Sequence, residues 1–406
     1  SYPVQWADVD LPHTWNAVDG NDGNGSYYRG TCWYAKTFPT PVQPLAGGRV
    51  FIEFEGANSE ATVYVNGAEA AHHRCGYTAF RCEIGEGHPK IAFLAEYDAL
   101  PGYGPERNQN GHACGHNWIA ACTFGAADVL AQVKEHFNGT IVYIGTPAEE
   151  GTGGKVDLVN AGCFEDIDAA FQMHLTSGGT QLNGSSLAID SLEFTFEGKA
   201  AHAAGAPWDG INALDAAYLM INGINALRQH VTPDTRIHGI IEDGGAAPNI
   251  VPAHAVYKVF CRAADRDYLN TVTQKVINCA KGAELMTGAK MSYRFYENSF
   301  DNLNCNPVLV EQMAKNLEAI GYTTFGKDKQ APSGSTDLGN VSRVVPTCYV
   351  SLDVENTDGS SCHNEAFLAH VDGELAYKAN LTAIKAMAAC ALDVFMDAEL
   401  LASIAK

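Results

Sequence analysis

The sequence has little positive charge and no long apolar run, and these two absences exclude two classes of partner. Its 406 residues carry 26 Lys and Arg against 47 Asp and Glu, for a formal net charge of −21. Because binding to a phosphate backbone needs a basic face, nucleic acid is not expected as a partner. No run of eighteen apolar residues is present, so neither a membrane-spanning helix nor a membrane partner is expected.

The sequence also lacks the cysteine spacing of a disulfide framework. Its 12 Cys residues are scattered at long intervals, which in a chain of this size indicates reduced thiols. The first residues, SYPVQWADVD, show neither the basic start nor the apolar stretch of a signal peptide. Reduced thiols indicate a cytoplasmic protein. Since 46% of the residues are hydrophobic and 18% charged, we also expect a globular protein.

Two short stretches contain side chains that bind divalent metal ions in proteins. The stretch GHACGH places Cys114 and His116 one residue apart in a glycine-rich loop, and thiolate and imidazole are preferred zinc ligands. The stretch TPAEEGTGG places Glu149 and Glu150 side by side after an apolar run typical of a buried strand. Adjacent residues on an extended chain point to opposite faces, so one glutamate is able to bind metal while the other moves a proton. A base beside a metal-bound water is the minimal apparatus for amide hydrolysis.

Strands and helices alternate in the part of the chain that carries these stretches. The pattern predicts strands ending at Glu96–Asp98, at 140–145 and at 169–174, and a helix at 118–136. Such alternation predicts a mainly parallel sheet, with ligands gathered at the carboxyl ends of its strands. Asp98, Glu149 and His174 all follow such ends, which favours one shared site.

A second unit interrupts this α/β pattern. From about residue 191 the expected order is strand, helix, strand, strand, helix, strand, which is a ferredoxin-like βαββαβ unit. The α/β pattern then resumes with a helix at 308–320, a strand at 347–352 and a long helical stretch. We therefore expect an α/β protein in four segments: a partial β-sandwich (1–75), the first part of a catalytic domain (76–190), a lid and dimerisation domain (191–298) and the second part of the catalytic domain (299–406).

The first segment has its own character. Alternating β-branched and aromatic runs at 49–56 and 61–70, with Asn66 and Gly67 between strands, predict short strands and a turn. The stretches LPHTWNAVDG and SYYRGTCWYAKTF resemble part of the sugar-binding sandwich of glycoside hydrolase family two. The segment contains Trp6, Trp15 and Trp33, which fit either stacking on a sugar or packing in a sandwich core. We interpret the segment as structural or vestigial.

From about Tyr77 onward the chain resembles the M20 metallopeptidase family, which includes aminoacylases, carnosine-type dipeptidases and aminobenzoyl-glutamate hydrolases. Six ordered motifs carry the resemblance: AEYDALPG, GHACGHN, GTPAEE, GKAAHAA, PNIVP and GSTDLGNVS. In that family a helix and a sheet strand normally precede the first motif. Here the sugar-binding-like segment stands in their place.

The resemblance implies a site for two metal ions. Five residues stand at its metal-ligand positions: Cys114, His116, Glu150, His174 and His363. Glu149 occupies the position of the general base. Asp98 would orient a ligand without binding an ion itself. Glu96 stands where other branches have a His ligand and is not counted as a ligand.

The resemblance also assigns residues of the inserted unit. His202 matches a histidine that reaches the active site of the neighbouring subunit, and Asn249 and Arg262 match positions near the substrate carboxylate and the developing oxyanion. Each candidate also fits a structural role on its own. A free Cys often packs as a small hydrophobe, a Glu pair often lies on a solvated face, and Arg262 fits a charge at a strand edge.

The prediction is a two-metal amidohydrolase of the aminoacylase or dipeptidase type, which cleaves the amide of small N-acyl amino acids or dipeptides through a metal-bound water. Zinc is the favoured ion, with manganese or cobalt as alternatives, and a homodimer is expected. One rival hypothesis is a carbohydrate-binding module fused to an inactive metallohydrolase scaffold. Another is a metal-binding scaffold made inactive by the missing N-terminal elements.

Overall fold

The computed structural model describes residues 33–35, 51–54, 57, 60–65, 68–74, 80–83, 88–104, 106, 109–326 and 334–405. The chain divides into two compact units, Ser1–Pro44 and Leu45–Lys406, and the elements named below belong to the second. Trp6, Trp15 and most of the predicted partial sandwich lie outside the described residues.

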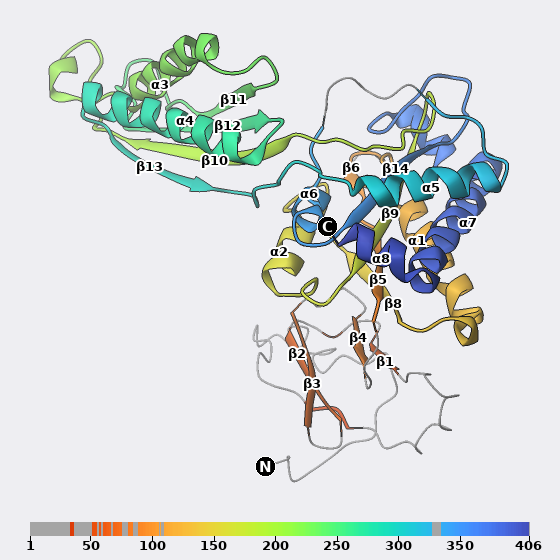
Figure 1. Ribbon diagram of the computed structural model, residues 1–406. Helices are drawn as coiled ribbons and strands as arrows, with labels where there is room; N and C mark the ends of the chain where they lie inside the picture. Colours follow the sequence, from red (N-terminus) through yellow and green to blue (C-terminus); the bar gives the residue numbers. More distant parts are fainter. Residues whose placement is uncertain are drawn as a thin grey trace. The chain divides into compact units, whose positions relative to one another are not determined.

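A four-stranded parallel sheet forms the centre of the catalytic part, as the alternating sequence pattern predicts (Figure 1). Its strands, in spatial order, are β14 (Thr347–Asp353), β9 (Ala169–Thr176), β5 (Lys90–Glu96) and β8 (Thr140–Thr146). Each neighbouring pair is parallel, so the carboxyl ends of all four strands meet at one edge of the sheet.

Both faces of this sheet are covered by helices, because its strands are apolar on both sides. Along β5, Ile91 and Phe93 enter one core, whereas Ala92 and Leu94 enter the other. The helices of the first core are α1 (His116–Gln132), α5 (Pro307–Ala319), α7 (Glu374–Met396) and α8 (Ala398–Ile404). The helices of the second core are α2 (Gly154–Asn160) and α6 (Leu338–Ser342).

Helix α7 is long and apolar enough, by length and composition alone, to cross a membrane. Half of its most apolar window is buried inside the protein. Its buried side, which includes Ala383, Met387 and Val394, belongs to the first core and contacts α1 and α5. The apolar composition of α7 is therefore accounted for by packing against its neighbours.

A second sheet is inserted between β9 and α5. Its elements, in chain order, are β10 (Ala188–Glu197), α3 (Ala213–Leu227), β11 (Arg236–Asp243), β12 (His254–Ala263), α4 (Arg266–Thr287) and β13 (Lys290–Phe295). The sheet order is β11-β12-β10-β13 and every neighbouring pair is antiparallel. Both helices share one core with the sheet, which contains Leu192, Phe194 and Val259. The order of the six elements is the one that the sequence indicates, and we call residues 188–295 the insert.

Among the described residues, four short strands precede β5. Strand β1 (Phe51–Phe54) pairs antiparallel with β4 (Phe80–Glu83), and β2 (Glu60–Val65) pairs antiparallel with β3 (Ala68–Arg74). The β2–β3 hairpin lies where the sequence predicts two strands around a turn. Strand β4 contacts β8, the strand at one edge of the parallel sheet.

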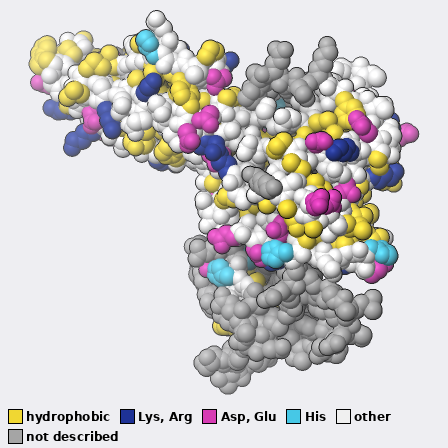
Figure 2. All heavy atoms as spheres, in the orientation of Figure 1, with side chains coloured by type: hydrophobic (Ala, Val, Ile, Leu, Met, Phe, Trp, Pro, Cys, Tyr) yellow, Lys and Arg dark blue, Asp and Glu magenta, His cyan; other side chains and the backbone are white. Residues whose placement is uncertain are grey.

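The other described elements are short. They are β6 (Leu100–Pro101), β7 (Asn110–Gly111), and 3-10 helices at Lys134–His136, Pro207–Asp209, Arg228–His230 and Glu365–His370. On the face of the molecule in Figure 2, the described Lys and Arg side chains are spread among acidic ones and do not form one continuous basic surface. This distribution agrees with the strongly acidic composition.

Candidate active site

The predicted catalytic side chains lie where parallel strands end. Strand β5 ends at Glu96, two residues before Asp98, and β8 ends three residues before Glu149. His174 lies near the end of β9, between these two strands and β14. The edge at which the strands end therefore collects residues that are far apart in the sequence.

The loop before α1 holds two further candidates. Gly115 has φ +89° and caps the helix, so the chain turns sharply between Cys114 and His116, the first residue of α1. His116 is 1% exposed and Cys114 is 8% exposed. The Sγ atom of Cys114 lies 3.5 Å from Nε2 of His174.

His363 comes from the loop after β14 and has an unusual backbone. Its φ is +64°, a left-handed conformation that is uncommon for a residue other than glycine. Its N–H donates to the carbonyl of Ala113 at 2.9 Å, and its own carbonyl accepts from the Tyr103 hydroxyl at 2.8 Å. These two bonds fix the position from which its Nε2 approaches Oε1 of Glu150, at 3.1 Å.

The structure brings all five predicted ligands together. Within each of three sets, one possible ligand atom from every member lies within 4.8 Å of the others: Cys114, His116 and His174; Cys114, Glu150 and His363; His116, Glu149 and Glu150. Around a tetrahedral zinc ion, ligand atoms lie about 3.3–3.6 Å apart. The separations of 3.5 Å between Cys114 and His174 and 3.1 Å between Glu150 and His363 come close to that range.

Two buried atoms of this cluster support the presence of cations. Nε2 of His116 and Oε1 of Glu150 are inaccessible to solvent and make no hydrogen bond of good geometry with any described residue, although Glu96 and His363 lie 3.4 and 3.1 Å away. A buried polar atom without a partner is costly, and both atoms are metal-ligand types. The pKa of the Cys114 thiol is raised by its hydrogen bond with Cys362, by burial, and by the negative charges of Glu150 and Glu149. A cation would neutralise this accumulated negative charge, so the residues fit divalent metal.

Asp98 lies where a carboxylate that orients ligands is needed. One of its oxygens lies 2.7 Å from Nδ1 of His116, and the other accepts the backbone N–H of Glu150 at 2.9 Å. Burial works against ionisation of Asp98, but the hydrogen bond and charge of His116 outweigh it and lower the pKa of Asp98. The Nδ1 contact leaves Nε2 of His116 directed at the cluster.

Glu149 lies beside a buried ionic cluster. A carboxylate oxygen of Glu149 lies within 4.8 Å of one from Glu96 and one from Asp337. The Nζ atom of Lys155 donates to Glu96 and Asp337, at 2.6 Å each. Removal from water, followed by the charges of Glu96 and Asp337, raises the pKa of Glu149 well above its ordinary value. A carboxylate with a raised pKa is suited to accept a proton.

Glu96 uses one oxygen for this cluster and leaves the other near the ligands. Its Oε1 accepts from Lys155 and from Gln172, at 2.8 Å for the latter, while Oε2 lies 3.4 Å from Nε2 of His116. Burial opposes ionisation of Glu96, but the charges of Lys155, His116 and His174 outweigh it and lower its pKa to about 2. Glu96 is therefore an ionised neighbour of the site.

Two of the three predicted residues of the insert, His202 and Asn249, form their hydrogen bonds within the insert. His202 is exposed, its Nδ1 accepts the backbone N–H of Gly205 at 2.9 Å, and it forms a β-bridge with Ile250. Asn249 is exposed beside it, and its carbonyl accepts from the N–H of Ala203 at 3.0 Å. Among the described residues, none of the metal-ligand sets contains a residue of the insert.

Arg262 is held differently. Its Nη1 atom donates to Oγ of Ser335 at 3.1 Å, which links β12 of the insert to the catalytic part. Its Nε atom is buried and has no hydrogen-bond partner in the described part of the chain, and burial lowers the pKa of the guanidinium. An unpaired N–H of a buried cation is suited to an anionic group of a ligand.

Comparison with known proteins identifies the family. The family model described as Peptidase family M20/M25/M40 matches residues 92–387, which include the five candidate ligands and Glu149. The chain belongs to this family. It is therefore a hydrolase of the M20 amidohydrolase and peptidase type.

Individual M20 relatives agree with this assignment. The chain is 36% identical over 349 residues to the Xaa-Arg dipeptidase of Mus musculus, and the match covers 81% of this chain and 77% of the relative. It is 34% identical over 282 residues to one of the subunits of the p-aminobenzoyl-glutamate hydrolase of Escherichia coli, and that match covers 64% of this chain and 58% of the relative.

A solved structure supports the fold. It is a dinuclear metal-binding M20 peptidase of Bacillus subtilis, with a TM-score of 0.58 at 21% identity, covering 86% of this chain and 85% of the other. The comparisons give no support to the resemblance of residues 1–75 to a glycoside hydrolase sandwich, nor to a fused carbohydrate-binding module.

Some residues of the M20 site were missed by the sequence reasoning. Lys155 and Asp337 are 0% exposed, and Tyr103 and Cys362 contact the backbone of candidate ligands. Asp337 lies in the motif GSTDLGNVS, which gave a hint of its importance. No sequence pattern marks Lys155 as a site residue, because its partners are 59 and 182 residues away in the sequence.

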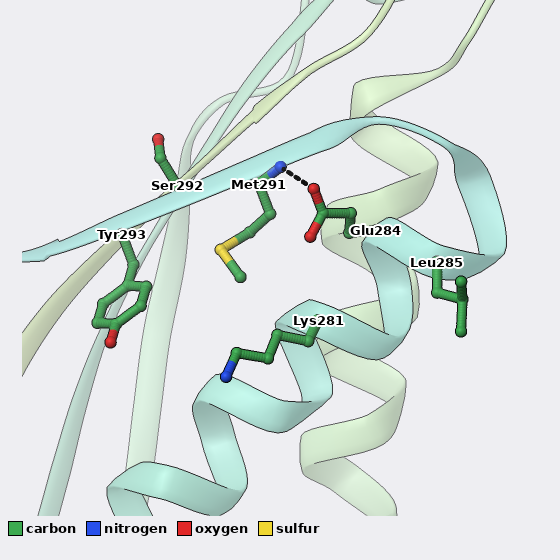
Figure 3. A pocket seen from close by; sticks show the side chains of 6 residues that line it. All are labelled: Lys281, Glu284, Leu285, Met291, Ser292 and Tyr293. Atoms are coloured by element: carbon green, nitrogen blue, oxygen red, sulfur yellow. Dashed lines mark hydrogen bonds between the residues drawn. The ribbon is translucent and has the colours of Figure 1, made fainter.

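A cavity of the insert is separate from this site. It has a volume of about 680 Å³ and lies between the end of α4 and β13 (Figure 3). Its lining residues are Lys281, Glu284, Leu285, Met291, Ser292 and Tyr293, and Oε1 of Glu284 accepts the N–H of Met291 at 3.1 Å. None of these residues belongs to a metal-ligand set formed by the residues that the structure describes, so the cavity is distinct from the candidate catalytic centre.

Proposed function

We propose that this M20 hydrolase cleaves the amide bond of small N-acyl amino acids or dipeptides with two divalent metal ions. The observation that carries the proposal is the convergence of five candidate ligands on one sheet edge, with Glu149 next to them. The similarity to a dipeptidase and to an aminobenzoyl-glutamate hydrolase supports the substrate class, since both names denote cleavage of an amide to an amino acid.

The ligands divide naturally into two groups that share Cys114. One group contains His116 and His174, and the other contains Glu150 and His363. A thiolate and imidazole set favours zinc, with manganese or cobalt as alternatives. Divalent ions held there would supply Lewis acidity, which activates water and polarises the scissile carbonyl.

Glu149 supplies the proton transfer in this proposal. It accepts a proton from the attacking water and later returns it to the leaving amine, as its raised pKa permits. The ammonium group of Lys155 forms ion pairs with Glu96 and Asp337. Its positive charge reduces the repulsion among the buried carboxylates of Glu96, Asp337 and Glu149. Asp98 keeps His116 and the backbone of Glu150 in position.

The insert would recognise the substrate. Arg262, with its unpaired Nε atom, would bind the free carboxylate, and so would Asn249, which lies beside His202. His202 would donate a hydrogen bond to the oxygen that gains charge during attack, a contribution of about 3 kcal/mol in enzymes from which one such donor was removed. We propose that the insert acts as a lid and that the protein is cytoplasmic. The proposed domain limits are those predicted from the sequence, 76–190, 191–298 and 299–406, and the middle range differs by three residues at each end from the insert (188–295).

A homodimer formed through the insert is the proposed assembly. Within the described residues, β11 and β13 each have one neighbouring strand, so each leaves an unpaired edge. Unpaired edges are usually covered or paired in folded proteins. Each edge strand has an exposed apolar side chain: Ile240 of β11 is 64% exposed and Phe295 of β13 is 47% exposed. Two copies that pair along such an edge would bury both the backbone and these side chains.

The test combines metal analysis with a substrate panel. The purified protein should bind two divalent ions per chain and hydrolyse at least one member of a panel of Xaa-Arg dipeptides, β-alanyl dipeptides, N-acetyl amino acids and p-aminobenzoyl-glutamate. Removal of the ions with a chelator should abolish turnover, and zinc or manganese should restore it. Bound metal without turnover of any member would support an inactive scaffold instead.

A further inference from the structure

A second cysteine lies against the candidate ligand Cys114. Cys362 directly precedes His363, in a different loop from Cys114 and 248 residues away along the chain. The Sγ atom of Cys362 lies 3.6 Å from the carbonyl oxygen of Cys114 and 3.5 Å from that of Leu175. Neither thiol is in a disulfide.

The backbone holds this pair together. The N–H of His363 donates to the carbonyl of Ala113 at 2.9 Å, so the two loops are joined at positions adjacent to both cysteines. A disulfide needs side chains that approach from backbones a few ångströms apart. Since the two loops are already joined at this point, a disulfide between Cys114 and Cys362 requires little movement of either.

The two thiols differ in accessibility and role. Cys114 is 8% exposed and belongs to two metal-ligand sets, whereas Cys362 is half-buried and belongs to none of the sets found among the described residues. The adjacent His363 side chain is 54% exposed, so small solutes reach this loop. Cys362 is therefore the thiol that a dissolved oxidant meets while Cys114 is engaged with metal.

We propose that Cys114 and Cys362 form a redox-sensitive pair, in which a peroxide creates a disulfide that withdraws Cys114 from the metal site. The proposal rests on the proposed role of Cys114 as a ligand. The Cys362 sulfur attacks one peroxide oxygen, an S–O bond forms, the O–O bond breaks, and water leaves with the thiol proton. The Cys114 sulfur then attacks the Cys362 sulfur, the S–S bond forms, the S–O bond breaks, and a second water leaves. Two thiols lose two electrons and two protons, and one hydrogen peroxide becomes two waters.

The consequence is a reversible loss of metal. A sulfur in a disulfide has no charge to offer an ion, so both metal-ligand groups that share Cys114 are weakened together. A dithiol reductant restores the thiolate and with it the site. Bound metal opposes the reaction, since it keeps Cys114 from attacking, so oxidation should be faster in the metal-free protein.

The experiment uses the full chain loaded with zinc and treated with hydrogen peroxide, with and without prior removal of the metal. After free thiols are blocked, peptide mass mapping should find a link between Cys114 and Cys362, formed faster without metal. A zinc indicator should report metal release that dithiothreitol and added zinc reverse. The buried pair Cys348 and Cys390, 1% and 0% exposed, should stay reduced.

Two variants separate this pair from general oxidation. Cys362→Ser should keep its zinc under peroxide, at the level of the untreated protein, while Cys163→Ser, which removes an exposed thiol elsewhere, should lose zinc as the parent does. If Cys362→Ser is poorly folded, Cys362→Ala replaces it. A peptide map without the Cys114–Cys362 link, or equal zinc loss from the Cys362 variants, would overturn the proposal. Peptide mapping does not depend on enzymatic activity. A protein that forms the Cys114–Cys362 disulfide but does not bind metal would therefore contradict the proposed function while still supporting the redox-sensitive pair.

Discussion

At the scale of single residues, Glu149 and Glu150 divide two tasks between neighbouring side chains. Glu150 points towards His363, with its backbone N–H bound to Asp98. Glu149 belongs to the ionic cluster around Lys155. Ala148, which directly precedes the pair, has φ +59°, a left-handed backbone that helps to turn the two side chains to different partners.

This division predicts opposite effects of two matched substitutions. Glu149→Gln should keep both metal ions and lower kcat by about 10²–10⁴, the usual range for a lost general base. Glu150→Gln should lower metal occupancy, because an amide carries no negative charge to balance the ion. Metal analysis and kinetics on both variants provide the check, and the opposite pattern would exchange the two roles.

Tyr103 is predicted to position a metal ligand without touching metal. Its hydroxyl holds the carbonyl of His363, whose backbone is in an uncommon conformation. Tyr103→Phe removes only that hydrogen bond, and the affinity for metal should fall by about 10–100-fold, as is usual for groups that orient ligands. Zinc titration measures this effect directly.

A matched control is available in the insert. The hydroxyl of Tyr268 accepts the backbone N–H of Thr232 at 3.0 Å, far in the sequence from the ligands. Tyr268→Phe should leave metal affinity unchanged. If Tyr103→Phe behaves in the same way, the bond between His363 and Ala113 is sufficient to hold the ligand.

At the scale of elements, the sequence predicted the regular parts of the fold because their periodicity is strong. The apolar strand β8 and the helix α1, with Ile119, Ala126 and Leu130 on its buried side, follow the expected periods of strand and helix. Helix α6 and the strands β6 and β7 were missed, since five or two residues carry no measurable period.

The same reasoning explains which site residues were predicted. Cys114, His116 and the Glu pair lie in short stretches whose chemistry is visible locally. The cluster of Glu96, Lys155 and Asp337 joins β5, α2 and the residue before α6, and no local pattern encodes a pairing across such distances. The sequence likewise did not predict that His202 and Asn249 lie side by side, because the conformation of two loops brings them together.

The first turn of α2 is predicted to depend on the charge of Lys155. This side chain is 0% exposed, and its ammonium group is within hydrogen-bond distance of two buried carboxylates. Lys155→Met leaves those carboxylates without their cation, so the free energy of unfolding should fall by about 3–5 kcal/mol. The exposed Lys385 of α7 offers the control, and Lys385→Met should change stability little. Denaturant unfolding of both variants tests the difference, and equal stability would show that Glu96 and Asp337 are neutral in the folded protein.

At the scale of the whole molecule, the insert is tied to the catalytic part by a few specific contacts. Ile189 at the start of β10 bridges Phe300, and Nη1 of Arg266 reaches the carbonyl of Phe300. Arg266 is itself held by a buried ion pair with Asp190 inside the insert. Arg262 reaches Ser335. The insert thus has defined attachments, whereas the hydrogen bonds of His202 lie within its own loops.

The last prediction is that His202 acts on the site of a second copy of the chain. His202 is exposed, belongs to none of the metal-ligand sets found among the described residues, and forms its hydrogen bonds within its own loop. For His202 to act in the active site of a second copy, the two copies need only to pair through their inserts. His202→Ala and Glu149→Gln proteins should each be nearly inactive, because one lacks the oxyanion donor and the other the base.

Mixing the two variants distinguishes these arrangements. If subunits exchange, half of the dimers contain one of each chain, and one of their two sites then has both His202 and Glu149 intact. Activity should recover to about a quarter of that of the parent, assuming random exchange and independent sites. Mass spectrometry of differently labelled chains verifies exchange. If His202 acts in the site of its own chain, every site in the mixture carries one of the two substitutions and activity does not recover. Full exchange without recovery would therefore mean that His202 acts within its own chain or takes no part in the reaction.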